Sequence, residues 1–249
     1  MSSEVLSNPN HAPLSDSEVE LRERLLEVGF QIIEDAPQNH VSYDIEGDGE
    51  AFALGSIFSW GGVAPSGDTF YDELRPLFPD KFTPSRRQFC EDHGLGVERL
   101  MDEGTDPQEA TEKLVTWLNE QTEKTGKKPL MVGQAIAWDY SMTHAYFANY
   151  GIDDPFGRTP KPLDICGEAF AGVAGYDMKQ TGKEDFPRFI WPDQEFPHQA
   201  LEDSKIQGVL HAGVLALDAT LRNSDLAQDL GLEPALRARG FEAMANQIR

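Results

Sequence analysis

The chain has 249 residues, enough for one large domain or one domain with extensions, and its 43 Asp and Glu residues against 21 Lys and Arg give a formal net charge of −22. Such a surface repels polyanions at long range. This lowers the expectation of general nucleic-acid affinity without excluding it, because a high-salt cytoplasm would screen the repulsion. With no run of about 18 apolar residues and no basic, apolar leader, we expect neither a membrane-spanning helix nor a secretory signal.

The two cysteines bear on the cellular compartment. Cys90 and Cys166 are far apart and form no CxxC pair, so we expect free thiols in a reducing environment. A cytoplasmic location without a membrane partner follows from these expectations.

The N-terminal part of the chain predicts one helix and then several strands. Residues 15–28 begin with polar residues that can cap a helix and continue with apolar residues spaced along approximately one face, which is typical of an amphipathic helix. A strand is expected over 41–46, a β-rich stretch over 51–62, and another strand over 68–74. Strands that follow one another so closely predict an antiparallel meander.

Helical patterns dominate the remainder. Helices are expected over 83–93 and 105–124, then a short buried strand over 130–136 and a helix over 139–151. A long helix follows over 199–222. Strands first, and then alternating helices and strands, predict an α/β domain with a mixed sheet flanked by helices.

Residues 40–50, HVSYDIEGDGE, place two acids in what is otherwise a buried strand. Because side chains alternate along a strand, Asp44 and Glu46 share the face opposite Val41, Tyr43 and Ile45. Two carboxylates so close repel each other, and a divalent cation between them would remove the repulsion. A solvated acidic turn at the end of the strand would give the same pattern, so the stretch alone leaves both interpretations open.

Three further residues carry candidate chemistry. Asp139 begins a helix, where an ordinary N-terminal acid is also stabilised by the helix dipole. Asp203 lies three residues before Ile206, on the inward stripe of the long helix, where an unpaired charge is costly. His198 is about 140° around a helix from Asp203, so it can reach the same site only from just before the first turn.

Together these residues resemble the motifs of the DEDDh 3′–5′ exonucleases: DxE on a strand, Asp at the start of a middle helix, and HxAxxD on a late helix. Asp44 and Glu46 match the first motif, Asp139 the second, and His198 with Asp203 the third. The resemblance covers about residues 40–217 and implies a ribonuclease H-like fold.

The resemblance also implies a mechanism. The four acids would hold two divalent metal ions, Mg²⁺ or Mn²⁺, and His198 would take the proton from the attacking water. The substrate would be the 3′ end of single-stranded DNA or RNA, and the product a nucleoside 5′-monophosphate. Related exonucleases are often homodimers, which the residues of this chain do not establish.

The chain departs from the family pattern in two places. Gln134 and Ala135 stand where the second motif usually has His-Asn, and Gly47 stands where the first motif usually continues with Thr. Asp48 adds a further negative charge beside the expected phosphate. These changes leave the expected metal ligands intact but put the contacts to the substrate backbone and terminal nucleotide in doubt.

The sequence also predicts the limits of three segments and leaves two other functions open. We expect an N-terminal extension with one helix over 1–36, an exonuclease domain over 37–222 and a helical C-terminal extension over 223–249. A non-catalytic nucleic-acid-binding or scaffold module of the same fold would have the same pattern. So would a phosphodiesterase of very short oligonucleotides, which would largely escape the polyanion repulsion.

Several other polar residues are expected to lie outside the site. His93 has no companion acid at a useful spacing, so it is expected to be structural or on the surface. Arg86 and Arg87 are expected to be solvated surface groups rather than phosphate contacts.

Overall fold

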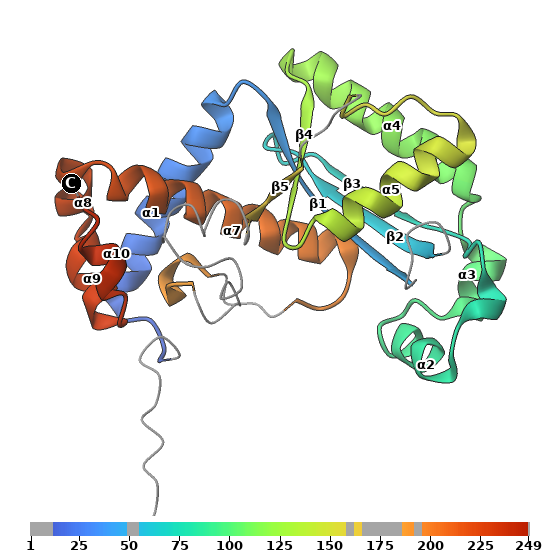
Figure 1. The fold of residues 1–249 in the computed structure, drawn as a ribbon, viewed down its shortest axis with the longest axis horizontal. Coiled ribbons are helices and arrows are strands. Elements are labelled where there is room, and N and C mark those ends of the chain that lie inside the picture. The colour runs from blue at the N-terminus through green and yellow to red at the C-terminus, as the bar shows by residue number, and fades with distance from the viewer. Residues whose placement is uncertain (1–11, 49–54, 158–161, 166–185, 192–195, 249) are drawn as a thin grey trace, which may run out of the picture. The chain divides into compact units, whose positions relative to one another are not determined.

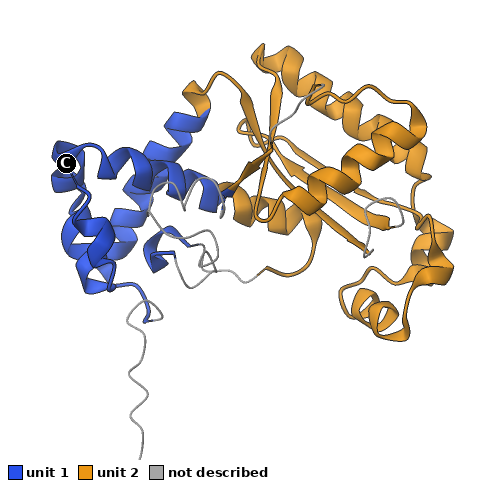
Figure 2. Cartoon of the chain, in the orientation of Figure 1, with its two compact units in different colours: residues 1–33, 165–193, 209–249 blue, residues 34–164, 194–208 orange. Residues whose placement is uncertain are grey.

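The computed structural model describes residues 12–48, 55–157, 162–165, 186–191 and 196–248 (Figure 1). Cys166 and the start of the β-rich stretch 51–62 lie outside them. The chain divides into two compact units (Figure 2): the first contains Met1–Ile33, Ile165–Asp193 and Val209–Arg249, and the second Glu34–Asp164 and Gln194–Gly208. The expected domain limits at 37 and 222 stay a prediction.

The second unit contains a five-stranded mixed sheet in the order β3-β2-β1-β4-β5. Its strands are β1 (Asn39–Asp48), β2 (Ser56–Val63), β3 (Thr69–Glu73), β4 (Pro129–Gly133) and β5 (Leu163–Asp164). β1, β2 and β3 form the expected antiparallel meander, whereas β4 pairs in parallel with β1 and β5. The expected α/β fold with a mixed sheet is therefore confirmed.

Helices α4 (Pro107–Thr125) and α5 (Ala137–Tyr150) contribute to the core that the sheet buries on one face. Val41, Tyr43 and Ile45 of β1 lie in this core with large side chains of β2, α4 and α5. α4 begins at the Asp106 cap and ends where Gly126 takes a φ of 67°. Burial of the odd-numbered residues of β1 leaves Asp44 and Glu46 on the opposite face, as the alternation predicts.

The first turns of α7 (Ala200–Leu221) pack against that opposite face. Ser42 Oγ donates a hydrogen bond of 2.7 Å to the carbonyl of Ser204. Gly61 on β2 lies opposite Asp44 in the sheet, and a Cβ built on Gly61 would lie 2.1 Å from the carbonyl atoms of Ala200. The absence of a side chain at residue 61 therefore lets α7 approach the sheet closely.

Two other helices of the second unit follow β3. α2 (Pro84–Asp92) corresponds to the helix expected over 83–93, and its cap, Thr83, accepts a hydrogen bond from the Arg86 amide. α3 (Val97–Glu103) was not expected from the sequence. The apolar side chains of Cys90 and Leu100 join Phe58 of β2 in a small separate core that holds α2 and α3.

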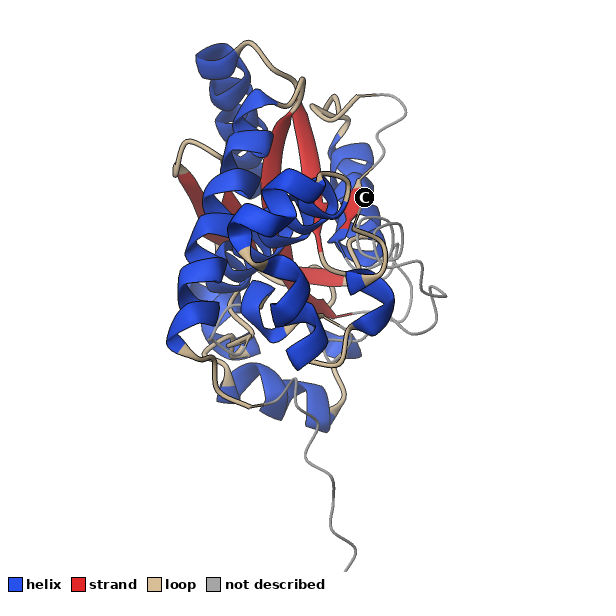
Figure 3. Ribbon diagram, turned by 90° about the vertical axis from the view of Figure 1, so that its left-hand side faces the viewer, coloured by secondary structure: helices blue, strands red, loops and turns tan. Residues whose placement is uncertain are grey.

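All described strands belong to the second unit, and the regular elements described in the first unit are helices (Figures 2 and 3). They include α1 (Asp16–Asp35), α8 (Ser224–Leu230), α9 (Leu232–Ala238) and α10 (Glu242–Ala245). The buried Arg239 forms an ion pair with Glu18 of α1 at 2.6 Å and holds the pKa of that carboxyl at about 2. Among the described residues, no helix is both long enough and apolar enough to span a membrane.

Two of the element limits that differ from the expectation have a local cause. α1 runs seven residues past Val28, because the buried Gly29 and Ile33 continue its inward face. The strand expected over 130–136 ends at Gly133, because Ala135 takes a left-handed φ of 54°, which turns the chain into α5.

Substitution of Gly61 tests the close approach of α7. Gly61→Ala should lower the free energy of unfolding by about 1–3 kcal/mol, because the added methyl group overlaps the Ala200 backbone. Urea denaturation measures the change. The control is Gly208→Ala, since a Cβ there would make an ordinary 3.5 Å contact with Ser42 and should be neutral or stabilising in a helix. Equal stability of the two variants would contradict the described packing.

Candidate active site

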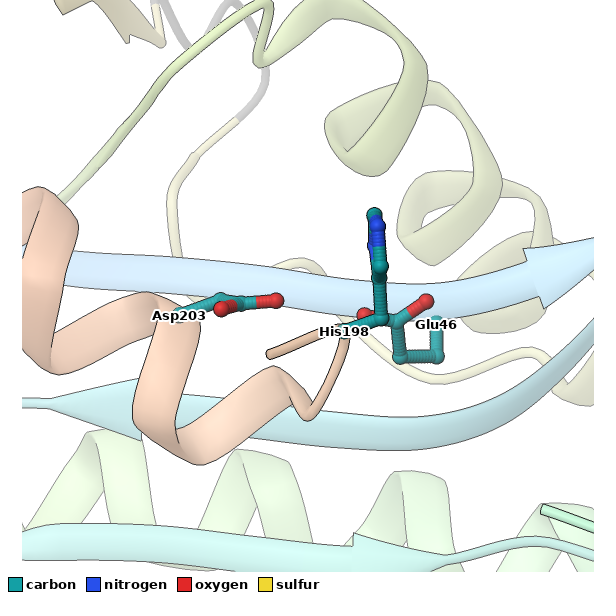
Figure 4. A group of neighbouring side chains, drawn as sticks. All are labelled: Glu46, His198 and Asp203. Carbon is teal, nitrogen blue, oxygen red and sulfur yellow. The ribbon is translucent and has the colours of Figure 1, made fainter. Parts of the chain in front are cut away.

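Three elements of the second unit carry the predicted site residues. Asp44 and Glu46 lie on β1, Asp139 in the first turn of α5, and Asp203 in the first turn of α7. Glu46, His198 and Asp203 each offer a ligand atom, and these atoms lie within 4.8 Å of one another. Figure 4 shows Asp203 extending from α7 toward Glu46 and His198. The structure therefore brings residues from distant parts of the sequence to one place.

His198 lies just before α7, as expected from its spacing to Asp203. It has a φ of 57°, in the left-handed region that His tolerates better than most residues. This conformation turns the chain sharply before Ala200. The imidazole is exposed, whereas Asp203 is only 3% exposed. The histidine can thus meet solvent at the edge of a site whose acids are more deeply placed.

Asp139 connects α5 to β1. Its Oδ1 accepts a hydrogen bond of 3.0 Å from the backbone amide of Ile45, between the two acids of β1. Burial raises the pKa of Asp139 to about 7, and the hydrogen bond from Ile45 opposes part of this increase. Asp139 is therefore more than an ordinary acid at a helix start, because it is buried and directed at the strand of the first motif.

Gln207 is a site residue that the sequence reasoning missed. Its Nε2 donates a hydrogen bond of 2.7 Å to Asp44 Oδ1, and its Oε1 accepts one of 3.0 Å from the backbone N–H of Gln134. Gln207 is 3% exposed and lies one helical turn after Asp203. A polar residue four positions after an inward acid is the signal that would have identified it.

The acids of the site oppose one another's ionisation. Burial raises the pKa of Glu46 to about 8, and the charges of Asp203 and Asp139 add to the increase. Burial also raises the pKa of Asp44 well above its usual range, with further contributions from Asp139, Glu46 and Asp203. Oxygen donors that repel one another in this way suit a hard divalent cation, whose charge removes the repulsion. The residues present therefore fit a metal site.

The structure explains one departure from the family pattern. A Cβ built on Gly47 would lie 2.9 Å from both the Trp138 ring and the carbonyl oxygen of Ser56. The indole that precedes Asp139 thus takes the space that a side chain at residue 47 would need. Asp48, the additional acid, has a carboxylate oxygen 3.7 Å from the Arg86 guanidinium, which offsets part of its charge.

His93, expected to be structural or on the surface, lies beside His198. Its ring lies edge-on to that of His198, with the ring centroids 5.0 Å apart. Arg86 lies on α2 and His93 caps its C-terminus, so this helix lies beside the end of β1 and the start of α7. Arg87 contacts Glu98 and the carbonyl of Pro79 instead.

Comparisons with known proteins relate the chain to nucleases, although no protein-family model matches it. It is 30% identical over 173 residues to the 3′–5′ DNA exonuclease Cap18 of Escherichia coli, covering 68% of this chain and 88% of that protein. The nuclease domain of 3′hExo, a DEDDh family member bound to rAMP, has a TM-score of 0.55 and 15% identity, over 73% of this chain and 92% of that one.

A second solved structure has a similar fold. Exonuclease I of E. coli in complex with a dA16 oligonucleotide has a TM-score of 0.55 and 14% identity. The match covers 77% of this chain and 45% of that one. At this level of identity, the two solved structures show that the fold is shared.

The left-handed residue Ala135 allows a test of the second motif. Asn tolerates this conformation better than Ala, so Ala135→Asn should raise the free energy of unfolding by about 1 kcal/mol. Ala137→Asn is the matched control, because Ala137 lies in the regular helix α5 and should show no gain. Urea denaturation of both variants measures the difference, and an equal response would contradict the φ assigned to Ala135.

The raised pKa values predict how stability depends on pH in EDTA. Glu46 and Asp139 have folded-state pKa values of about 8 and 7 against ordinary values of 4.5 and 3.8. Between these limits the folded state binds more protons than the unfolded state, so stability falls as pH rises. Melting temperatures should therefore decrease from about pH 5 to about pH 8.

Two variants separate this effect from the general charge of the protein. Glu46→Gln should reduce the slope of melting temperature against pH, because it removes one titrating group from the cluster. Glu123→Gln, at an exposed position of α4, should leave the slope unchanged. If the melting temperature of the wild type and of Glu123→Gln instead rose from about pH 5 to about pH 8, the carboxylates would not repel one another as described.

Proposed function

The chain belongs to the DEDDh family of 3′–5′ exonucleases, and we propose that it removes nucleotides one at a time from single-stranded 3′ ends. The proposed cofactors are two divalent ions, Mg²⁺ or Mn²⁺, held by Asp44, Glu46, Asp139 and Asp203. We favour DNA as the substrate, because the curated relative is named a DNA exonuclease. A homodimer, as in related exonucleases, stays a prediction.

One observation carries the proposal. The ligand atoms of Glu46, His198 and Asp203 lie within 4.8 Å of one another, and the charges of Asp139, Glu46 and Asp203 all help to raise the pKa of Asp44. Such a set of oxygen donors with one exposed imidazole is suited to hydrolysis of a phosphodiester. Two divalent ions in such a site supply activation of the nucleophile and stabilisation of charge on the leaving oxygen.

The protein groups have separate parts in the reaction. The carboxylates would hold the ions, and Gln207 would orient Asp44 through its 2.7 Å hydrogen bond. His198 would accept a proton from the water whose oxygen forms the new bond to phosphorus. The bond from phosphorus to the 3′ oxygen breaks, which releases a nucleoside 5′-monophosphate and leaves a new 3′ hydroxyl on the strand.

Degradation of a 5′-labelled single strand in Mn²⁺ tests the proposal. The wild type should shorten the strand stepwise from the 3′ end, and EDTA should abolish the reaction. His198→Ala should lower kcat about 10²–10⁴-fold through loss of the base, and Asp44→Ala should lower it at least as much. His144→Ala is the matched control, since that exposed histidine pairs with Asp154 and should not affect the rate.

The substrate alternatives are outcomes of the same experiment. DNA and RNA strands are compared over increasing salt, because of the net charge of −22, and dinucleotides are compared with long strands. Cleavage of dinucleotides alone would indicate a phosphodiesterase of very short oligonucleotides. A folded protein that binds the strand and Mn²⁺ but shortens nothing would indicate a binding module.

A further inference from the structure

Helix α2 presents one face to the active site, and its residues are not among those that the family motifs include. Arg86, Phe89 and Cys90 of α2 and its C-cap, His93, are spaced by three, one and three residues, so they lie along one side. Cys90 is buried in the small core with Phe58 and Leu100. The burial of Cys90 fixes the position of α2, and Arg86, Phe89 and His93 lie on either side of Cys90 along this face.

Phe89 is an exposed aromatic ring beside the proposed catalytic base. Its ring centroid lies 5.5 Å from that of His198 and 4.2 Å from that of His93. Nδ1 of His93 is 2.8 Å from the carbonyl oxygen of Phe89, which sets the position of the His93 ring. Although three rings contact one another here, Phe89 remains 39% exposed. A large apolar surface next to reacting groups is suited to a planar ligand.

Arg86 supplies positive charge on the same side of the helix. Its side chain is 56% exposed, and its Nε lies 3.7 Å from an Asp48 carboxylate oxygen. Because the guanidinium is exposed and the contact is long for an ion pair, this pair contributes little to stability, so a phosphate could replace Asp48 at low cost. The guanidinium is suited to bidentate phosphate binding. The acids of the site repel the phosphates of a nucleic-acid strand, and a cation beside them would attract one of those phosphates.

We propose that α2 is a strand-binding helix, in which Phe89 stacks on a base adjoining the scissile phosphodiester and Arg86 binds a backbone phosphate. His93 holds the rings of Phe89 and His198 in position. The inference rests on the proposed exonuclease function. Stacking on an aromatic face does not distinguish one base from another, so this helix would bind single strands without sequence preference.

The test of Phe89 compares intact strands with strands that lack one base. Phe89→Ala should raise KM on an intact strand about 5- to 100-fold, the loss expected for one stacked base, with little change in kcat. Phe89→Trp should restore KM. On a strand made abasic at the stacked position, wild type and Phe89→Ala should have the same KM. Gln88→Ala, which affects a neighbouring side chain paired with Asp92, is the control and should match wild type.

The test of Arg86 uses the salt dependence of strand binding. Fluorescence anisotropy of a 5′-labelled strand is measured in an Asp139→Asn background, which removes turnover without altering α2. Arg86→Ala should reduce the slope of log Kd against log salt by about 0.7, the value for one phosphate contact on a single strand. Arg87→Ala should leave the slope unchanged, because Arg87 pairs with Glu98. Circular dichroism confirms that each variant is folded.

The outcomes separate this inference from the proposed function. An unchanged Kd and KM in Phe89→Ala, or an equal loss on intact and abasic strands, would overturn the stacking role. A salt slope that is the same in Arg86→Ala and Arg87→Ala would overturn the phosphate contact. If the wild type hydrolyses no strand, the proposed function fails, and the anisotropy measurements still decide whether α2 binds one.

Discussion

The second unit places several carboxylates close enough to oppose one another's ionisation. Asp44, Glu46, Asp139 and Asp203 come from three elements and lie in a part of the fold where burial raises the pKa of Asp44, Glu46 and Asp139. A fold that only needed stability would not collect acids there, because each charge costs desolvation energy and raises the energy of the others. The arrangement becomes favourable when divalent cations occupy the site, because their charge removes the repulsion.

Backbone features allow this arrangement to form. Gly61 lets the first turn of α7 reach the sheet, and the φ of His198 turns its ring toward Glu46 and Asp203. Hydrogen bonds to Asp139 from Ile45 and to Asp44 from Gln207 then fix two of the acids. These two acids are thus held by neutral groups, which do not cancel their negative charge.

The departures from the family pattern have local explanations. Gly47 is compatible with the ring of Trp138, which takes the space beside it. Ala135 occupies a left-handed position at which Asn has a lower cost, so Ala is a less favourable residue for this turn. Asp48 has a nearby cation in Arg86. In each case the acids of the site keep their positions.

The sequence by itself determined the acids, the histidine and the faces that they share. Alternation along β1 and the spacing of His198 and Asp203 are local periodicities, which depend only on backbone geometry. The tertiary structure decided the rest: the contact of α2 with His198, the hydrogen bonds of Gln207, and the left-handed turn at Ala135. These features join residues far apart in the chain or depend on a turn between two packed elements. No local pattern specifies them, because their energies arise only when the elements have packed together.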